Sequence, residues 1–268
     1  MIVRLKRYFV YLMNEYYKKK MRAYLTKADL PHEKLGTKYG IGVIPSNFLN
    51  SESVCYCAGA GDDISFDLEL IKKFKCKVFI FDPTPRAKNH YEELVLRTNK
   101  GEKMLIGHDS TSLFYSVGPD DLKLSSFYQI GLWSEDKILK FFPPKSDKDV
   151  SYSLLNLHKT DDPIEVECKT VGHIMSMLGH KDINLLKLDI VGAEYEVVDS
   201  LIADKIFPEI LLIEFDEGSL ASYFQTAESH YFRRITRTIE KLLAAGYILT
   251  RVEDWNATFV KESAIPKT

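Results

Sequence analysis

A run of small and acidic residues is the first part of this sequence that could do chemistry. The segment Gly59-Ala60-Gly61-Asp62-Asp63 combines two glycines with two carboxylates. Glycines let a backbone approach a ligand more closely than a β-carbon would allow, although a GxG pair alone is weak evidence. Asp82 lies 21 residues beyond Gly61, near the spacing of about 20 residues at which an acidic side chain binds ribose hydroxyls in nucleotide-binding folds.

The two aspartates Asp62 and Asp63 indicate which class of ligand the glycine segment could bind. A dinucleotide fingerprint would place a third glycine at Ile64 and would favour a pyrophosphate at the helix start. Carboxylates at Asp62 and Asp63 would repel a pyrophosphate, but they suit the ammonium and sulfonium groups of S-adenosylmethionine (SAM). The alternative is purely structural, with Asp62 or Asp63 capping a helix and Asp82 capping a turn.

Further carboxylates follow two apolar runs later in the chain. Asp189 directly follows Leu185–Leu188 and is the first candidate for a general base or for a group that orients a hydroxyl acceptor. Glu194, and Glu214 or Asp216, are second candidates. Such carboxylates could also bind Mg²⁺, although no other metal ligand set is predicted. Asp189 could instead cap the helix that follows it.

Elements that alternate along the chain would bring these residues together. Short apolar runs predict strands, and residues at helical spacing predict helices between them. The predicted strands are Val54–Ala58, Val78–Phe81, Phe127–Leu132, Leu185–Asp189 and Glu209–Phe215, followed by a hairpin of Tyr247–Val252 and Ala257–Val260. The predicted helices are Ile64–Phe74, one after Gly192, and Glu228–Ala245. Two prolines, Pro83 and Pro85, argue against a helix interior directly after the second strand.

This alternation predicts an α/β fold with a seven-stranded, mostly parallel sheet that a C-terminal antiparallel hairpin completes, the Rossmann-like fold of class I methyltransferases. In an open α/β sheet, ligands bind outside the carboxyl ends of the strands. The candidate residues all follow predicted strands, so the topology would gather them at one edge. Residues 51–268 are expected to form this SAM-binding domain, after a helical extension and linker at residues 1–50.

Four blocks in the expected order resemble FkbM-type SAM-dependent methyltransferases over roughly residues 50–260. They are Tyr56–Asp67, Phe81-Asp82-Pro83-Thr84-Pro85-Arg86, Gly131-Leu132-Trp133 and Leu186–Glu194. The resemblance implies O-methyl transfer from SAM to a hydroxyl of a sugar, glycan or related metabolite. Cofactor binding is assigned to Gly59, Ala60, Gly61, Asp63, Asp82, Pro83, Leu132, Trp133 and Asp189, with Trp133 flanking adenine, and catalysis to Asp189, Glu194 and Glu214. Ser151-Tyr152-Ser153 could contact the acceptor or form an ordinary turn.

The sequence departs from the family pattern at Val191, where the family usually has glutamate, and at Cys57, which stands where many methyltransferases have a glycine. The loss of one carboxylate favours an alternative function, a catalytically weak binding or partner module on the same fold. A nicotinamide-dependent oxidoreductase is the other alternative, supported only by the strand, GxG and helix order.

Charge is distributed unevenly. Residues 1–28 contain eight Lys or Arg and one Glu, so this segment carries +7 and the other 240 residues carry −9 of the chain's net −2. The overall balance does not favour nucleic acid as a partner. Tyrosines and other apolar residues lie between the basic residues of the segment. It is expected to be either a helix packed on the domain or one that contacts an anionic membrane surface at its periphery.

Cysteine spacing and the absence of a signal-peptide pattern suggest a reducing compartment. Cys55, Cys57, Cys76 and Cys168 show no CxxC spacing, and we expect reduced thiols rather than a zinc site. We therefore expect a cytoplasmic protein, with or without peripheral contact at the inner face of the membrane. The sequence does not predict an oligomeric state.

Overall fold

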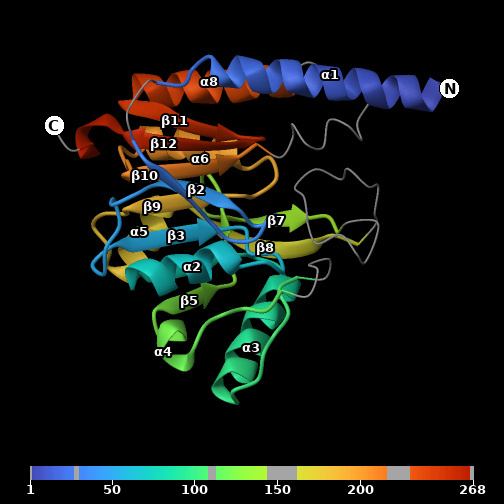
Figure 1. Cartoon of the computed structure of the whole chain (residues 1–268). Helices are drawn as coiled ribbons and strands as arrows, with labels where there is room; N and C mark the ends of the chain where they lie inside the picture. The colour runs from blue at the N-terminus through green and yellow to red at the C-terminus, as the bar shows by residue number, and fades with distance from the viewer. Residues whose placement is uncertain (1, 27–29, 108–112, 144–161, 216–229, 266–268) are drawn as a thin grey trace.

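A computed structural model describes residues 2–26, 30–107, 113–143, 162–215 and 230–265 (Figure 1). A 7-stranded sheet lies at its centre, with the strand order β11-β12-β10-β9-β3-β4-β5. These strands are β3 (Val54–Ala58), β4 (Lys77–Phe81), β5 (Ser125–Tyr128), β9 (Leu185–Leu188), β10 (Ile210–Glu214), β11 (Tyr247–Glu253) and β12 (Asn256–Lys261).

The sheet is mixed, which corrects the expectation of a mostly parallel sheet. The pairings from β5 through β4, β3 and β9 to β10 are parallel, whereas β12 is antiparallel to both β10 and β11. The turn Asp254-Trp255 explains the reversal, because a connection this short can join only antiparallel strands. The predicted C-terminal hairpin is confirmed.

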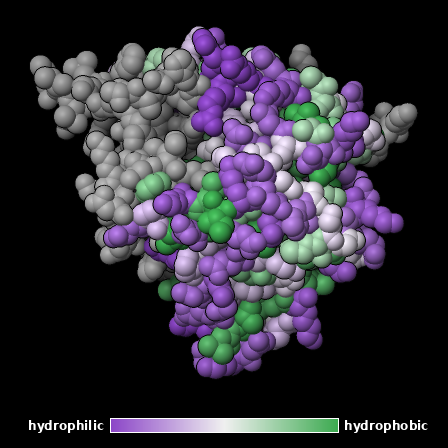
Figure 2. Space-filling model, turned by 180° about the vertical axis from the view of Figure 1, so that it is seen from behind, coloured by the Kyte–Doolittle hydropathy of each residue, from purple (hydrophilic) through white to green (hydrophobic). Residues whose placement is uncertain are grey.

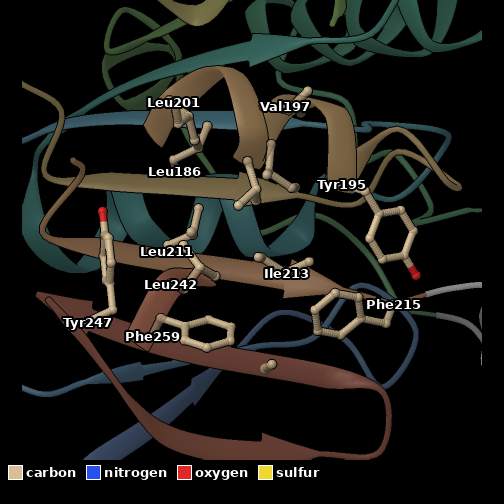
Figure 3. Packing of buried hydrophobic residues seen from close by; sticks show 14 of the residues in the cluster. Leu186, Tyr195, Val197, Leu201, Leu211, Ile213, Phe215, Leu242, Tyr247 and Phe259 are labelled. Atoms are coloured by element: carbon tan, nitrogen blue, oxygen red, sulfur yellow. The ribbon is translucent and has the colours of Figure 1, made fainter. Parts of the chain in front are cut away.

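One face of the sheet carries the larger apolar core. It is covered by α5 (Val171–Leu178), α6 (Glu194–Ala203) and α8 (His230–Ala244), together with the last turn of α1 (Ile2–Arg22). Figure 3 shows Leu186, Leu211 and Ile213 of the sheet facing Val197 and Leu201 of α6. Since each buried aliphatic side chain contributes about 1.5–3 kcal/mol, this layer fixes α6 and the loop before it relative to β9.

The opposite face is covered by α2 (Ser65–Phe74), α3 (Pro85–Asn99), α4 (Pro119–Leu122) and a hairpin of β1 (His32–Leu35) and β2 (Gly42–Pro45). Cys55 and Cys57 point into this second core with free, buried thiols. The β1–β2 hairpin is tied to the sheet where the Thr258 hydroxyl donates to the Val43 carbonyl at 2.6 Å. The central sheet is therefore enclosed on both sides.

A second, 3-stranded sheet has the order β6-β8-β7. It consists of β6 (Gly131–Leu132), β7 (Lys137–Phe141) and β8 (Ile164–Lys169). The prediction of one strand over Phe127–Leu132 is wrong, since β5 ends at Tyr128 and β6 pairs with β8 instead. A tight turn separates them, in which the Ile130 N–H donates to the Tyr128 carbonyl at 2.8 Å.

The helix α3 after the two prolines was not predicted, although Pro83 and Pro85 do lie outside the helix interior. Pro85 occupies the first turn of α3, where its missing N–H leaves no helical bond unmade. Thr84 caps this helix by accepting a hydrogen bond from the Ala87 N–H. The Asp-Pro-Thr-Pro block therefore ends a strand and starts a helix within four residues.

The surface seen from behind is mostly hydrophilic, with small separate hydrophobic patches (Figure 2). No helix among the described residues is long and apolar enough to cross a bilayer.

Candidate active site

The ends of β3, β4, β9 and β10 lie side by side and form what we call the carboxyl edge of the sheet. The Gly59 N–H donates to the Phe81 carbonyl at 2.9 Å, and the Asp189 N–H donates to the Ala58 carbonyl at 3.1 Å. Gly59 has a φ of +88°, and a β-carbon there would lie 1.8 Å from the Asp189 carbonyl oxygen. Glycine is therefore required at this position to let two strand ends approach each other.

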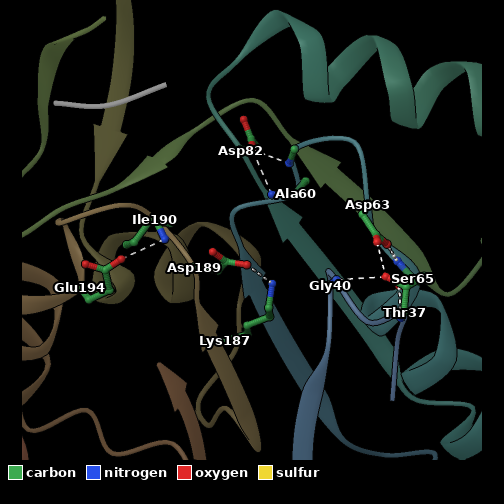
Figure 4. Close-up of polar contacts among 11 residues, drawn as sticks. Thr37, Gly40, Ala60, Asp63, Ser65, Asp82, Lys187, Asp189, Ile190 and Glu194 are labelled. Carbon is green, nitrogen blue, oxygen red and sulfur yellow. Dashed lines mark hydrogen bonds and ion pairs between the residues drawn. The ribbon is translucent and has the colours of Figure 1, made fainter. Parts of the chain in front are cut away.

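Asp82 ties the glycine loop to the end of β4 (Figure 4). Its Oδ2 accepts hydrogen bonds from the N–H groups of Ala60 at 2.9 Å and Gly61 at 3.0 Å. Its Oδ1 accepts from the N–H and the hydroxyl of Thr84. Burial raises the pKa of the Asp82 carboxyl, and these donors oppose that effect. The spacing from Gly61 therefore predicted a real proximity of loop and carboxylate.

The two aspartates of the loop have different partners. Asp63 accepts hydrogen bonds from the Ser65 N–H at 3.0 Å and from the Thr37 hydroxyl, which ties the start of α2 to the segment before β2. Asp62 forms an ion pair with Arg86 at 3.0 Å. The N-cap position of α2 is Ile64, which makes no side-chain cap hydrogen bond, so Asp63 bonds the first N–H of the helix from the position before the cap. One of the two negative charges is balanced from α3.

The Tyr115 side chain contacts the glycine loop, and the sequence did not predict this contact. Its hydroxyl accepts a hydrogen bond from the Ile64 N–H at 3.1 Å and lies 2.8 Å from Nε2 of His90. Burial raises the pKa of Tyr115 and lowers that of His90. A neutral phenol and a neutral imidazole therefore border the glycine loop near pH 7.

A buried ion pair stands at the end of β9. The ammonium of Lys187 lies 2.8 Å from Oδ2 of Asp189, with side-chain exposures of 6% for the lysine and 26% for the aspartate. Burial lowers the pKa of Lys187, but the carboxylates of Asp189 and Asp67 outweigh it and raise the pKa above its usual value. Asp189 therefore lies beside a permanent positive charge. Lys187 is a charged residue within the otherwise apolar, buried run Leu185–Leu188. This is the signal of a buried ion pair that the sequence prediction missed.

Glu194 is the first residue of α6 and follows the loop after β9. It is almost fully buried, and its two oxygens accept hydrogen bonds from the N–H groups of Ile190 at 3.2 Å and Gly192 at 2.8 Å. Burial raises its pKa to about 8, partly offset by these donors. Figure 4 shows its carboxylate turned toward Ile190. Glu194 thus holds the loop after β9 in shape.

This loop contains a strained residue. Val191 has a φ of +43°, a left-handed conformation that a β-branched residue adopts only at a cost of about 1–3 kcal/mol. The departure from the family pattern therefore coincides with backbone strain at the carboxyl edge.

Glu214 ends β10 and lines a small cavity of about 10 Å³ with Lys187, Gly42 and Asn256. Its side chain is half-buried. The structure therefore brings Glu214 and Asp189 to the same edge, with Lys187 lining the cavity beside Glu214. Asp216 and Ser151-Tyr152-Ser153 lie outside the described residues.

Pro83, Leu132 and Trp133 flank the other side of the edge. A β-carbon on Gly131 would lie 3.5 Å from Cγ of Pro83, so β6 begins next to the end of β4. Leu132 is buried, and the Trp133 N–H donates to the Lys169 carbonyl at 3.0 Å. Among the described residues, the buried indole Nε1 of Trp133 has no hydrogen-bond partner. This donor is available to a bound molecule.

No group of three or more His, Cys, Asp or Glu side chains within the described residues is placed to hold a metal ion. The expected possibility of Mg²⁺ has no support from this geometry, because Lys187 takes one of the Asp189 oxygens and backbone N–H groups take both oxygens of Glu194.

The fold and the residues at the carboxyl edge of the sheet define a Rossmann-like α/β domain. This edge carries the glycine loop, the Asp82 carboxylate and the ion pair of Lys187 with Asp189. Residues 56–249 match the family described as the methyltransferase FkbM domain. The chain therefore belongs to this methyltransferase family, as its sequence blocks suggested. No curated protein and no solved structure matched the chain.

Proposed function

We propose that this protein is a SAM-dependent O-methyltransferase that acts on a hydroxyl of a sugar, glycan or related metabolite. The observation that carries the proposal is the contact between Asp82 and the glycine loop within a chain of the FkbM methyltransferase family. In this contact, a carboxylate at the position that binds ribose in nucleotide-binding folds lies against the glycine loop. The carboxylates next to that loop suit a cationic ligand.

The residues at the edge fit SAM. Asp63 offers negative charge to its ammonium and sulfonium groups, while the charge of Asp62 is balanced by Arg86. The unpaired Nε1–H of Trp133 offers a donor to its adenine. Asp82 would bind the ribose hydroxyls. All four of its acceptor positions are used by protein donors, so ribose would replace the Thr84 hydroxyl, the one donor that can rotate away.

When bound, SAM supplies a methyl group attached to a positively charged sulfur. Asp189 would accept a hydrogen bond from the acceptor hydroxyl and take its proton as the oxygen reacts. Because the ammonium of Lys187 holds one oxygen of Asp189 in place, orientation of the acceptor hydroxyl is the larger contribution of this carboxylate. Glu214, on the neighbouring strand, would bind a second hydroxyl of the acceptor.

Calorimetric titration with SAM, its demethylated product S-adenosylhomocysteine and NAD tests the cofactor. We expect saturable binding of the first two and none of NAD. Asp82→Asn should weaken SAM binding by about 10- to 100-fold, since a hydrogen bond to a charged group contributes about 1.5–3 kcal/mol. Asp120→Asn, at a side chain that is 93% exposed, is the matched control and should bind as the wild type does.

Other outcomes favour the other functions. Binding of NAD but not of SAM would indicate an oxidoreductase. SAM binding without methyl transfer to any member of a panel of sugars and glycans would favour a binding module, an outcome that the strain at Val191 makes worth testing. Thermal unfolding of each variant shows whether a lost signal reflects the site or the fold.

A further inference from the structure

Helix α1 presents two unlike faces. Toward the protein, Met21 is fully buried and the Tyr17 ring stacks on Phe232 of α8 with 4.3 Å between centroids. A helix turns by about 100° per residue, so Tyr8 and Leu12 lie on the side roughly opposite Tyr17. The exposed side chains that share this outer face or border it are Tyr8, Tyr11, Leu12, Tyr16, Lys19, Lys20 and Arg22, which we call the outer face of α1.

The apolar part of this face is unusually exposed. Tyr8 is 63% exposed, Tyr11 59%, Tyr16 50% and Leu12 46%. Tyrosine has an apolar ring and a polar hydroxyl, the combination found at the boundary between lipid tails and water. The ammonium of Lys20 lies 5.1 Å from the centroid of the Tyr16 ring, so ring and charge are presented together.

Within the described part of the chain, no acidic side chain forms an ion pair with Lys19, Lys20 or Arg22 of this face. Among the residues that the structure describes, Glu15 and Asp254 both pair with Lys18 at the side of the helix. Lys19, Lys20 and Arg22 remain exposed to solvent. Together with the other charged residues of the segment, Lys27 included, they give residues 1–28 their charge of +7, against −9 in the rest of the chain.

The position of α1 relates the face to the active site. Asp254, the partner of Lys18, lies in the β11–β12 turn next to Asn256, which pairs with Glu214 at the carboxyl edge. The helix residues before Tyr17 therefore extend beyond that edge, by about 20 Å at 1.5 Å per residue. Figure 1 shows the N-terminal part of α1 projecting past the ends of the strands.

We propose that the outer face of α1 binds the surface of an anionic lipid bilayer, with the helix lying in the plane of the interface. A long, convex and basic helix with aromatic side chains on one face matches a flat surface of negative charge. The arrangement would hold the carboxyl edge of the sheet close to the membrane. The inference stands on the helix alone and does not depend on the proposed methyl transfer.

Co-sedimentation of the full chain with vesicles tests the inference. One set contains phosphatidylcholine only and the other phosphatidylcholine with 30% phosphatidylserine. We expect binding to the second set alone, weakened by added salt. The variant Lys19→Glu/Lys20→Glu/Arg22→Glu should lower the partition coefficient by at least about 100-fold, since each basic residue near such a surface contributes about 1 kcal/mol.

A charge-matched control separates a specific face from general attraction. Lys100→Glu/Lys123→Glu/Lys181→Glu changes the net charge by the same amount at exposed positions outside α1, and it should bind as the wild type does. Tyr8→Ser/Tyr11→Ser/Tyr16→Ser, also exposed, should weaken binding by about tenfold or more because the rings no longer enter the interface. Thermal unfolding should match the wild type for all three variants.

Three results would overturn the proposal. The first is failure of the wild type to sediment with the anionic vesicles, and the second is equal binding of the wild type to both vesicle sets. The third is an equal loss of binding in the α1 and control variants. If the wild type binds no vesicles, the positive charge of the outer face of α1 would instead favour an acidic protein as its partner.

Discussion

Lys187 and Asp189 form an ion pair two positions apart, on the same face of β9 and its extension. The lysine neutralises two carboxylates, those of Asp189 and Asp67, on the side of the sheet that α2 covers. Burial raises the pKa of Asp67 to about 6, and the charge of Lys187 limits that rise. Removal of the lysine would leave buried negative charge without compensation, which is costly in a protein interior.

We expect Lys187→Met to lower the free energy of unfolding at pH 8 by about 3 kcal/mol. Asp67→Asn in the same chain should recover part of this loss, since one of the two uncompensated carboxylates is then removed. Urea unfolding of the two single variants and the double variant measures the coupling. Lys100→Met, at an exposed position, should change the free energy by less than about 0.5 kcal/mol. Strictly additive effects in the double variant would contradict the arrangement.

At the scale of elements, the parts of the fold with local signals were predictable. The strands β3, β4, β9 and β10 are short apolar runs because they are buried on both faces. Strands of the 3-stranded sheet were not found. β6 has two residues, and β7 alternates between half-buried and exposed positions without an apolar pattern. Their pairing joins segments far apart in sequence, which no local pattern encodes.

The same distinction applies to the site. Asp82 and the glycine loop could be located from spacing and strand ends, because a parallel sheet brings such ends together. The contacts of Tyr115 with Ile64, and of Thr37 with Asp63, join segments that only the folded chain brings together. Glu194 was expected near the reacting groups, but its burial and its bonds to the loop after β9 appear only in three dimensions. The catalytic and cofactor roles stay predictions.

The glycine loop and the end of β9 offer a test at this scale. Gly59→Ala should destabilise the protein by more than about 3 kcal/mol, since the new β-carbon would overlap backbone that β3 and β9 hold in place. Gly101→Ala is the control with a similar φ of +75° and no atom within 4 Å. It should lose only the conformational cost of about 1–2 kcal/mol. Equal losses in thermal or urea unfolding would show that the close approach to Asp189 is unimportant.

For the whole molecule, buried carboxyl groups determine how stability changes above neutral pH. The pKa of Glu194 is raised to about 8 in the folded protein, well above the value of about 4.3 in an unfolded chain. Between these values the folded state keeps a proton that the unfolded state releases. The stabilisation from this proton is therefore complete below the unfolded pKa and is lost as pH rises through 8.

The window from pH 7 to pH 8 isolates this effect. His32, His90 and His180 have lowered pKa values, so they alter stability mainly below pH 7. Burial raises the pKa of the Cys57 and Cys168 thiols, so these two act above pH 8. We expect the free energy of unfolding of the wild type to fall by about 1 kcal/mol across the window. Glu194→Gln should flatten this slope, since glutamine does not titrate. Glu196→Gln, an exposed change in the first turn of the same helix, should keep the wild-type slope. A slope unchanged in Glu194→Gln would mean that the backbone N–H groups of Ile190 and Gly192 hold the buried carboxylate ionised at neutral pH, and that its charge, rather than its proton, shapes the loop beside the active site.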